Sequence, residues 1–226
     1  MLCGPGLYVN RGIAVGIDEP LTDADLDVVE QRSAAVGVPP SVEVTDVTHP
    51  GSLTLLERRS FGHDVESDVT VCVIELEQSD VTFEDLPELE RIIVTDSSLE
   101  QWMDVSAEGW GHVTAAARRA ADAFAHAAHV TGDRLLMAID AGDGRPLGCA
   151  SLTIAGEVAT LGGMSTIPAE RGRGVQSALI RHRLVAARAS GCTVAVSSAR
   201  TGGPSERNLM RHGFVATHSR RTYTRR

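Results

Sequence analysis

A turn rich in glycine and arginine, Arg171-Gly172-Arg173-Gly174, constrains the fold of this chain most strongly. It follows an apolar segment, Val158–Thr166, that predicts a strand, and it precedes a segment with apolar residues at helical spacing. The first turn of a helix leaves backbone N–H groups unpaired at the positive end of the helix dipole, so such a turn suits a phosphate or pyrophosphate. The stretch 157–184 therefore predicts a strand, an anion-binding loop and a helix.

Turn signals and apolar periodicity predict a mixed α/β (α+β) chain in two units. The first, residues 1–85, is a smaller α/β unit, and the segment 77–90 that follows it is acidic, contains proline and is typical of a linker. Its expected elements are a helix over 23–36 capped by Thr22, a strand over 42–47, a helix over 53–59 started by Ser52, and strands at 61 and over 69–76.

The second unit, residues 90–226, predicts a mostly antiparallel sheet with flanking helices. Its expected strands cover 91–95, 135–139, 147–154, 158–166, 193–197 and 214–224. Four helices are expected. One is capped by Asp96 or Ser97, one covers 113–129, one runs from the Gly/Arg turn to about residue 190, and one covers 205–212 with Ser205 as its cap.

The net charge of −9 is distributed unevenly. Residues 1–130 carry 24 acidic side chains and seven arginines, whereas residues 131–226 carry six acidic side chains and 14 arginines, and the chain has no lysine. The alternatives are an incidental composition and a C-terminal half built to receive a ligand with several phosphates. Nucleic acid is not expected as a partner, because aromatic residues make up only 4% of the chain and the acidic half would repel a phosphate backbone.

The four cysteines lie far apart and lack metal-ligand spacing, which predicts buried thiols in a reduced cytoplasm. No apolar run approaches the roughly 18–20 residues of a membrane span, so no membrane contact is expected. His126 and His129 share a helix face without a third ligand nearby, and no metal is expected. Trp102 and Trp110 are expected to pack in the core or to line a cleft.

The residues around the Gly/Arg turn resemble those of the GNAT superfamily, the GCN5-related N-acetyltransferases. The Arg/Gln-x-x-Gly-x-Gly/Ala loop of that family corresponds to residues 171–176, with Pro168 upstream and the pair Gly213-Phe214 after a short helix. The resemblance covers about 60% of the chain and includes the order of the expected elements. Gln176 departs from the motif, since glycine or alanine is usual at that position.

The resemblance implies acetyl-CoA as co-substrate and a strand splayed from its neighbour by a bulge. A backbone N–H near the bulge would polarise the thioester carbonyl. The acceptor would be an amine of a small molecule or a peptide. The residues implied in cofactor binding are Met164, Ser165, Thr166, Arg171, Gly172, Arg173, Gly174, Val175, Gln176, Ser177, Ser205 and Asn208.

The sequence offers one candidate for the general base and no tyrosine at the family's position for the general acid. Glu157 is the only acid on the strand before the loop, which makes it the candidate general base. The tyrosine that the family often uses to protonate the leaving thiolate is replaced by Leu209, and neither Tyr8 nor Tyr223 matches the motif.

The sequence leaves two alternatives to an active enzyme. A non-catalytic acyl-CoA-binding or regulatory module is favoured by Leu209 and by the lack of a clear base. A nucleotide-binding protein of another fold would need an acid about 20 residues beyond the loop, where Val194 stands. Neither the acceptor nor the oligomeric state follows from the sequence.

A short internal similarity links the two units. Residues 56–61 align with residues 209–214, and in both a short helix ends just before a phenylalanine. The alternatives are coincidence and an N-terminal unit that is a degenerate GNAT-like half.

Overall fold

The computed structural model describes residues 11–77, 91–112, 114–130 and 134–225, the side chains of 124 and 127–130 excepted. The chain divides into two compact units. The first comprises Met1–Val71, Ala199–Gly203 and Thr217–Arg226, and the second comprises Cys72–Ser198 and Pro204–Ala216. Most of the predicted linker lies outside the described residues.

The second unit contains strands β4 to β7 and most residues of β3 and β8, and these strands lie in the order β3-β8-β7-β6-β5-β4. From β4 to β7 each pair of neighbours is antiparallel, whereas β7 and β8 are parallel. This sheet confirms the mixed, mostly antiparallel architecture with flanking helices. The bounds are β3 (Val69–Glu75), β4 (Ile92–Asp96), β5 (Arg134–Asp140), β6 (Pro146–Ala155), β7 (Val158–Thr166) and β8 (Val194–Arg200).

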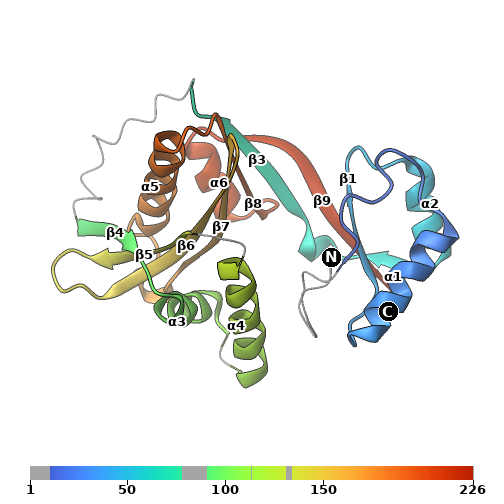
Figure 1. Ribbon diagram of the computed structural model, residues 1–226, viewed down its shortest axis with the longest axis horizontal. Helices are drawn as coiled ribbons and strands as arrows, with labels where there is room; N and C mark the ends of the chain where they lie inside the picture. The colour runs from blue at the N-terminus through green and yellow to red at the C-terminus, as the bar shows by residue number, and fades with distance from the viewer. Residues whose placement is uncertain (1–10, 78–90, 113, 131–133, 226) are drawn as a thin grey trace. The chain divides into compact units, whose positions relative to one another are not determined.

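Helices cover both faces of this sheet (Figure 1). Successive residues of a strand point to opposite faces of the sheet, and Leu135 packs in a cluster with Trp102 whereas Leu136 packs in a cluster with Leu179. The first cluster includes residues of α3 (Leu99–Trp110) and α4 (Ala115–Val130), and the second includes residues of α5 (Val175–Ala189). Helices α3 and α5 therefore lie on opposite faces of strands β5 to β7.

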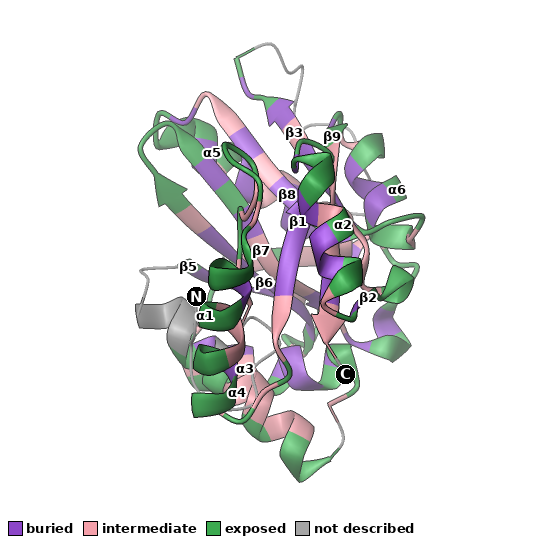
Figure 2. Ribbon diagram, turned by 90° about the vertical axis from the view of Figure 1, so that its right-hand side faces the viewer, coloured by how far each residue is buried: buried purple, intermediate pink, exposed green. Residues whose placement is uncertain are grey.

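The first unit has its own core. Strands β1 (Ser41–Thr45) and β2 (Phe61–His63) both pair antiparallel with β9 (Val215–Arg225). Helices α1 (Asp23–Ala35) and α2 (Pro50–Arg58) complete it. The buried cluster consists of Leu26, Val42, Val44, Leu55, Leu56, Phe61 and Tyr223. Figure 2 shows β1 largely buried and α1 largely exposed.

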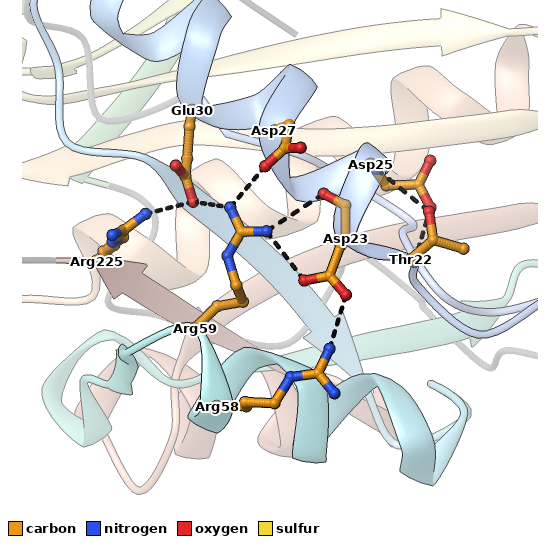
Figure 3. A network of polar contacts seen from close by, with 8 residues as sticks. All are labelled: Thr22, Asp23, Asp25, Asp27, Glu30, Arg58, Arg59 and Arg225. Carbon is orange, nitrogen blue, oxygen red and sulfur yellow. Dashed lines mark hydrogen bonds and ion pairs between the residues drawn. The ribbon is translucent and has the colours of Figure 1, made fainter.

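Polar contacts supplement the small apolar face of α1 (Figure 3). The Arg59 guanidinium donates to carboxylates of Asp23, Asp27 and Glu30 at 3.0, 2.7 and 2.8 Å. Arg225 forms an ion pair with Glu30 at 2.6 Å. Single exposed ion pairs contribute about 0–1 kcal/mol, so the network matters mainly because one guanidinium joins three acids of α1 to α2.

Two helices begin at a proline and not where the sequence predicted. Helix α2 begins at Pro50, because proline suits the first helical turn and the His49 side chain accepts the N–H of Gly51. Helix α6 (Pro204–Arg211) also begins at a proline, so Ser205 lies inside the helix and does not cap it.

The start of α3 also differs from the prediction. Its cap is Ser98, not Asp96 or Ser97. Ser98 and Gln101 form a capping box, in which each side chain accepts the other residue's backbone N–H. The cap predicted for α1, Thr22, is confirmed and forms the same arrangement with Asp25.

The internal similarity extends to local conformation. Ser60 and Gly213, which align, both adopt positive φ, 61° and 86°. Their N–H groups donate to aligned carbonyls, those of Glu57 at 3.0 Å and Met210 at 3.1 Å. A common helix-ending turn accounts for both, and the origin of the N-terminal unit as a degenerate half stays a prediction.

Candidate functional site

Strands β7 and β8 separate part of the way along their length. They pair only over Val158–Leu161 and Val194–Ser197, although β7 continues to Thr166 and β8 to Arg200. The buried hydroxyl of Ser197 donates to the Leu161 carbonyl at 2.9 Å, where the paired register ends. In the described register, the last five residues of β7 therefore have no partner on the β8 side.

A groove of about 560 Å³ lies at this end of β7, wholly within the second unit. Its lining comes from the end of α3, the end of β7, the loop and first turn of α5, and α6. Eleven of the twelve residues predicted to bind a cofactor line it, namely Met164, Ser165, Thr166, Arg171, Gly172, Gly174, Val175, Gln176, Ser177, Ser205 and Asn208. Arg173 is not among the lining residues.

The Gly/Arg turn exposes the N-terminus of α5 to this groove. Gly172 and Gly174 have φ of 77° and 80°, in the left-handed region that favours glycine. Gly174 is the N-cap, and no side chain caps the helix. Among the described residues no hydrogen bond occupies the N–H groups of Val175, Gln176 and Ser177. These three donors and the helix dipole create a positive site for an anion.

The two arginines of the turn have different surroundings. Arg171 lines the groove, and its Nη2 donates to the Gly109 carbonyl near the end of α3 at 3.0 Å. Arg173 forms ion pairs with Glu170 at 2.5 Å and Asp140 at 3.8 Å. The resemblance implied both arginines in cofactor binding, but the guanidinium of Arg173 is engaged by neighbouring carboxylates, whereas Arg171 lines the groove.

Glu170 is the one carboxylate among the described residues that line the groove. It is buried, and a hydrogen bond from Arg145 is the main cause that holds its pKa below the usual range, with Arg173 contributing further. A carboxylate with two guanidinium partners and a lowered pKa is a weak general base.

The structure places Glu157 away from the groove, which corrects its candidacy as the base. It lies in the exposed turn between β6 and β7, where its carbonyl accepts the N–H of Thr193 at 2.9 Å. Seven residues of extended chain, about 23 Å, separate it from Met164. Sequence proximity to the loop was misleading because the two ends of a strand lie far apart.

Leu209 and the candidate aromatic residues have different surroundings. Leu209 is 1% exposed and belongs to the core. Tyr223 stacks on His63 in the first unit, and Tyr8 lies outside the described residues. Trp102 is buried as expected, whereas Trp110 is 60% exposed and lines the groove.

A bulge interrupts the ladder between β6 and β7 close to the groove. Cys149 pairs with Ser165 and Ser151 pairs with Gly162, so one residue of β6 faces two residues of β7. Gly163 in this bulge has a φ of 52°. The bulge that the resemblance implied is therefore present, and Gly163 and Met164 are its two β7 residues.

Sequence reasoning missed Arg183, which contacts this bulge. The side chain is fully buried, and its Nη1 donates to the carbonyls of Ser151 and Gly162, both at 3.1 Å. One signal was available, because Arg183 lies four residues after Leu179 and four before Ala187, both on the apolar stripe of α5. A charged residue on such a stripe indicates a buried polar contact.

The cysteine beside the groove is expected to be unreactive. Burial raises the pKa of the Cys149 thiol to about 11, so at pH 8 roughly one molecule in a thousand carries the thiolate. Cys72 and Cys192 are also buried free thiols, whereas Cys3 lies outside the described residues. We expect mass mapping after iodoacetamide treatment at pH 8 to find these three unmodified in folded protein and modified in urea. Rapid labelling of Cys149 in the folded protein would contradict the burial.

The described residues contain no group of three metal-ligating side chains, and Nδ1 of His126 lies 2.7 Å from the Asp122 carbonyl. The side chain of His129 is outside the described part. No described helix is both long and apolar enough to cross a membrane.

Comparisons with known proteins agree with this geometry. The model of the acetyltransferase (GNAT) family matches residues 97–214, just over half of the chain. The fold is similar to that of a GCN5-related N-acetyltransferase from Kribbella flavida, with 17% identity, a TM-score of 0.67, and coverage of 94% of this chain and 80% of that one. It is also similar to a GCN5-related N-acetyltransferase from Sphaerobacter thermophilus, with 18% identity and a TM-score of 0.65.

That second match covers 86% of this chain, which spans 63% of the length of the Sphaerobacter protein. A search of curated proteins gave no significant match. The family match includes the whole of the Gly/Arg turn, α5 and α6. The chain therefore belongs to the GNAT family of acetyltransferases.

Proposed function

We propose that this chain is an acetyl-CoA-dependent N-acetyltransferase that acts on an amine of a small molecule or a peptide. One observation carries the proposal: a single groove joins the free N–H groups of α5 to the end of β7, which has no β8 partner. The first feature suits a pyrophosphate and the second suits an extended arm that contains amides. Coenzyme A contains both groups in sequence.

The residues fit such a ligand in two parts. The backbone N–H groups of 172–177 would hold the pyrophosphate, with Arg171 as the side chain that accompanies them. Arg173 would contribute through its N–H and not through its guanidinium. Met164, Ser165 and Thr166 would pair with the pantetheine arm, and Ser205 and Asn208 line the groove from α6.

The reaction would be a direct transfer. The amine nitrogen attacks the thioester carbonyl carbon, the C–N bond forms, and the C–S bond then breaks to release the thiolate of coenzyme A. The ammonium proton of the intermediate leaves to water in the open groove, and the thiolate gains a proton from solvent. A backbone N–H at the bulge would stabilise the oxyanion between these two events.

A second candidate, a non-catalytic acyl-CoA-binding or regulatory protein, is favoured by two specific positions. Leu209 is buried where the family often has a tyrosine, and Glu170 is held by two arginines. A thiol with an ordinary pKa near 8.5 leaves tolerably without an acid, so these positions slow turnover more than they prevent it.

The buried free cysteines suit the cytoplasmic location that the sequence predicted.

Ligand-dependent stability tests the cofactor. At about 100 times its Kd, acetyl-CoA is expected to raise the free energy of unfolding by roughly 2.7 kcal/mol, because it binds only the folded state. The measurement is thermal unfolding with acetyl-CoA, with coenzyme A, and with adenosine as the control that lacks phosphate. Absence of a shift with both coenzyme A ligands would exclude both candidate functions.

Thiol release then distinguishes the enzyme from the binding protein. With acetyl-CoA and a panel of small amines and peptide N-termini, free coenzyme A is expected to form only in the presence of an acceptor. Stabilisation by acetyl-CoA without thiol release across the panel would favour the non-catalytic candidate.

A further inference from the structure

The buried guanidinium of Arg183 has no ion-pair partner among the described residues. Its four contacts are with neutral acceptors: the carbonyls of Leu179 at 3.0 Å, and of Ser151 and Gly162 at 3.1 Å, and the Met164 sulfur at 3.0 Å. Burial of a charge without a carboxylate partner is costly, and an apolar residue at this position would avoid that cost. Three of the four acceptors lie at the bulge, which points to a role there.

A second side chain contacts the same bulge from the other face of the sheet. The indole N–H of Trp102 donates to the Ala150 carbonyl at 2.9 Å, and Ala150 is the β6 residue that faces the bulge. Trp102 belongs to α3 and Arg183 to α5, which cover opposite faces. A bulge leaves backbone groups without ladder partners, and these two side chains provide donors for three carbonyls at it.

The positive charge of Arg183 lies beside the end of β7. Burial lowers the pKa of Arg183 to about 9, so the group remains a cation at neutral pH. It contacts the carbonyl of Gly162 and the side chain of Met164, on either side of Gly163. Met164 in turn lines the groove. A fixed cation beside the end of β7 favours electron-rich groups that bind along that strand.

We propose that Arg183, together with Trp102, is a positioning residue that fixes the bulge so that the end of β7 binds the acyl-bearing arm of the donor. This inference rests on the proposed function, because it assigns the arm to Met164–Thr166. It predicts that the two halves of the ligand depend on different parts of the protein. The nucleotide half depends on the Gly/Arg turn, and the arm depends on Arg183.

The experiment separates these halves by calorimetry with two ligands. Acetyl-CoA carries the pantetheine arm, whereas 3′-phospho-ADP keeps the pyrophosphate but lacks that arm. The variants are Arg183→Met, Arg183→Lys and Trp102→Phe, with Arg188→Met as the matched control, since Arg188 is exposed on the same helix. Trp102→Phe keeps an aromatic ring at this position but removes the N–H donor together with part of the indole, and it serves if Arg183→Met does not fold.

Arg183→Met is expected to weaken acetyl-CoA binding about five- to tenfold, the range for lost hydrogen bonds, while 3′-phospho-ADP changes less than about twofold. Trp102→Phe should show the same split, Arg183→Lys a smaller one, and Arg188→Met none. Equal losses for both ligands, or a loss for neither, would overturn the positioning role and leave the cofactor assignment intact. If the wild-type protein binds neither ligand, the proposed function fails and this inference fails with it.

Discussion

Gly174→Glu is expected to abolish binding of coenzyme A. Gly174 is the N-cap of α5 and has a φ of 80°, so a side chain there both strains the turn and adds bulk at the groove. The added carboxylate would lie beside the N–H groups that we propose bind the pyrophosphate, and it would repel that group. Calorimetry should show affinity lower by on the order of 100-fold or more.

The matched control is Ala189→Glu, which adds the same charge at the last residue of α5. The two positions are fifteen residues apart, about 22 Å along the helix, so the control should leave affinity nearly unchanged. Circular dichroism would show that both variants are folded. Unchanged affinity in folded Gly174→Glu would remove the Gly/Arg turn from the cofactor site.

Gly163→Ala is expected to lower the free energy of unfolding by about 2–4 kcal/mol, from the strain of positive φ and from overpacking. Gly163 has a φ of 52°, and a methyl group there would lie 2.7 Å from Trp102 Cζ2 and 3.1 Å from Ser151 Oγ. Trp102 is fully buried and cannot easily move away. Urea denaturation would measure the change.

Gly156→Ala provides the comparison for this variant. Gly156 has a similar φ of 60°, but a methyl group there meets no atom within 4 Å. It should therefore show the backbone strain alone, about 1 kcal/mol. Equal losses of stability in the two variants would mean that the bulge has room for a side chain. That result would contradict the close packing of Trp102 on Gly163.

Local signals predicted the parts of the site that are contiguous in sequence. The strand Val158–Thr166 was predicted with the bounds that the structure gives, because its apolar residues end at a proline and a glycine-rich turn. The anion-binding loop followed from residue types whose effect is local, glycine at positive φ and a helix without a cap. The groove residues contributed by α6 came from the family resemblance, since the sequence separation is too large for local reasoning.

Long-range features could not be predicted in the same way. The parallel register of Val194 on Val158 depends on how α5 returns the chain, and no local pattern encodes it. Glu157 was misplaced for the same reason, since nearness in sequence does not give nearness in space. The role of Arg183 could not be predicted either, because the carbonyls that it binds come from strands that the fold brings beside α5.

The pairing of β9 has a practical consequence for work on truncated forms. Residues 217–225 of that strand belong to the first unit and pair with β1 and β2, and the family match ends before them, at residue 214. A fragment that starts at residue 90 would lose β1 and β2 and leave this strand with unpaired backbone groups, a template for aggregation. The region that matches the GNAT family should therefore be expressed with the N-terminal residues, and a single cut in the predicted linker does not yield two self-contained pieces.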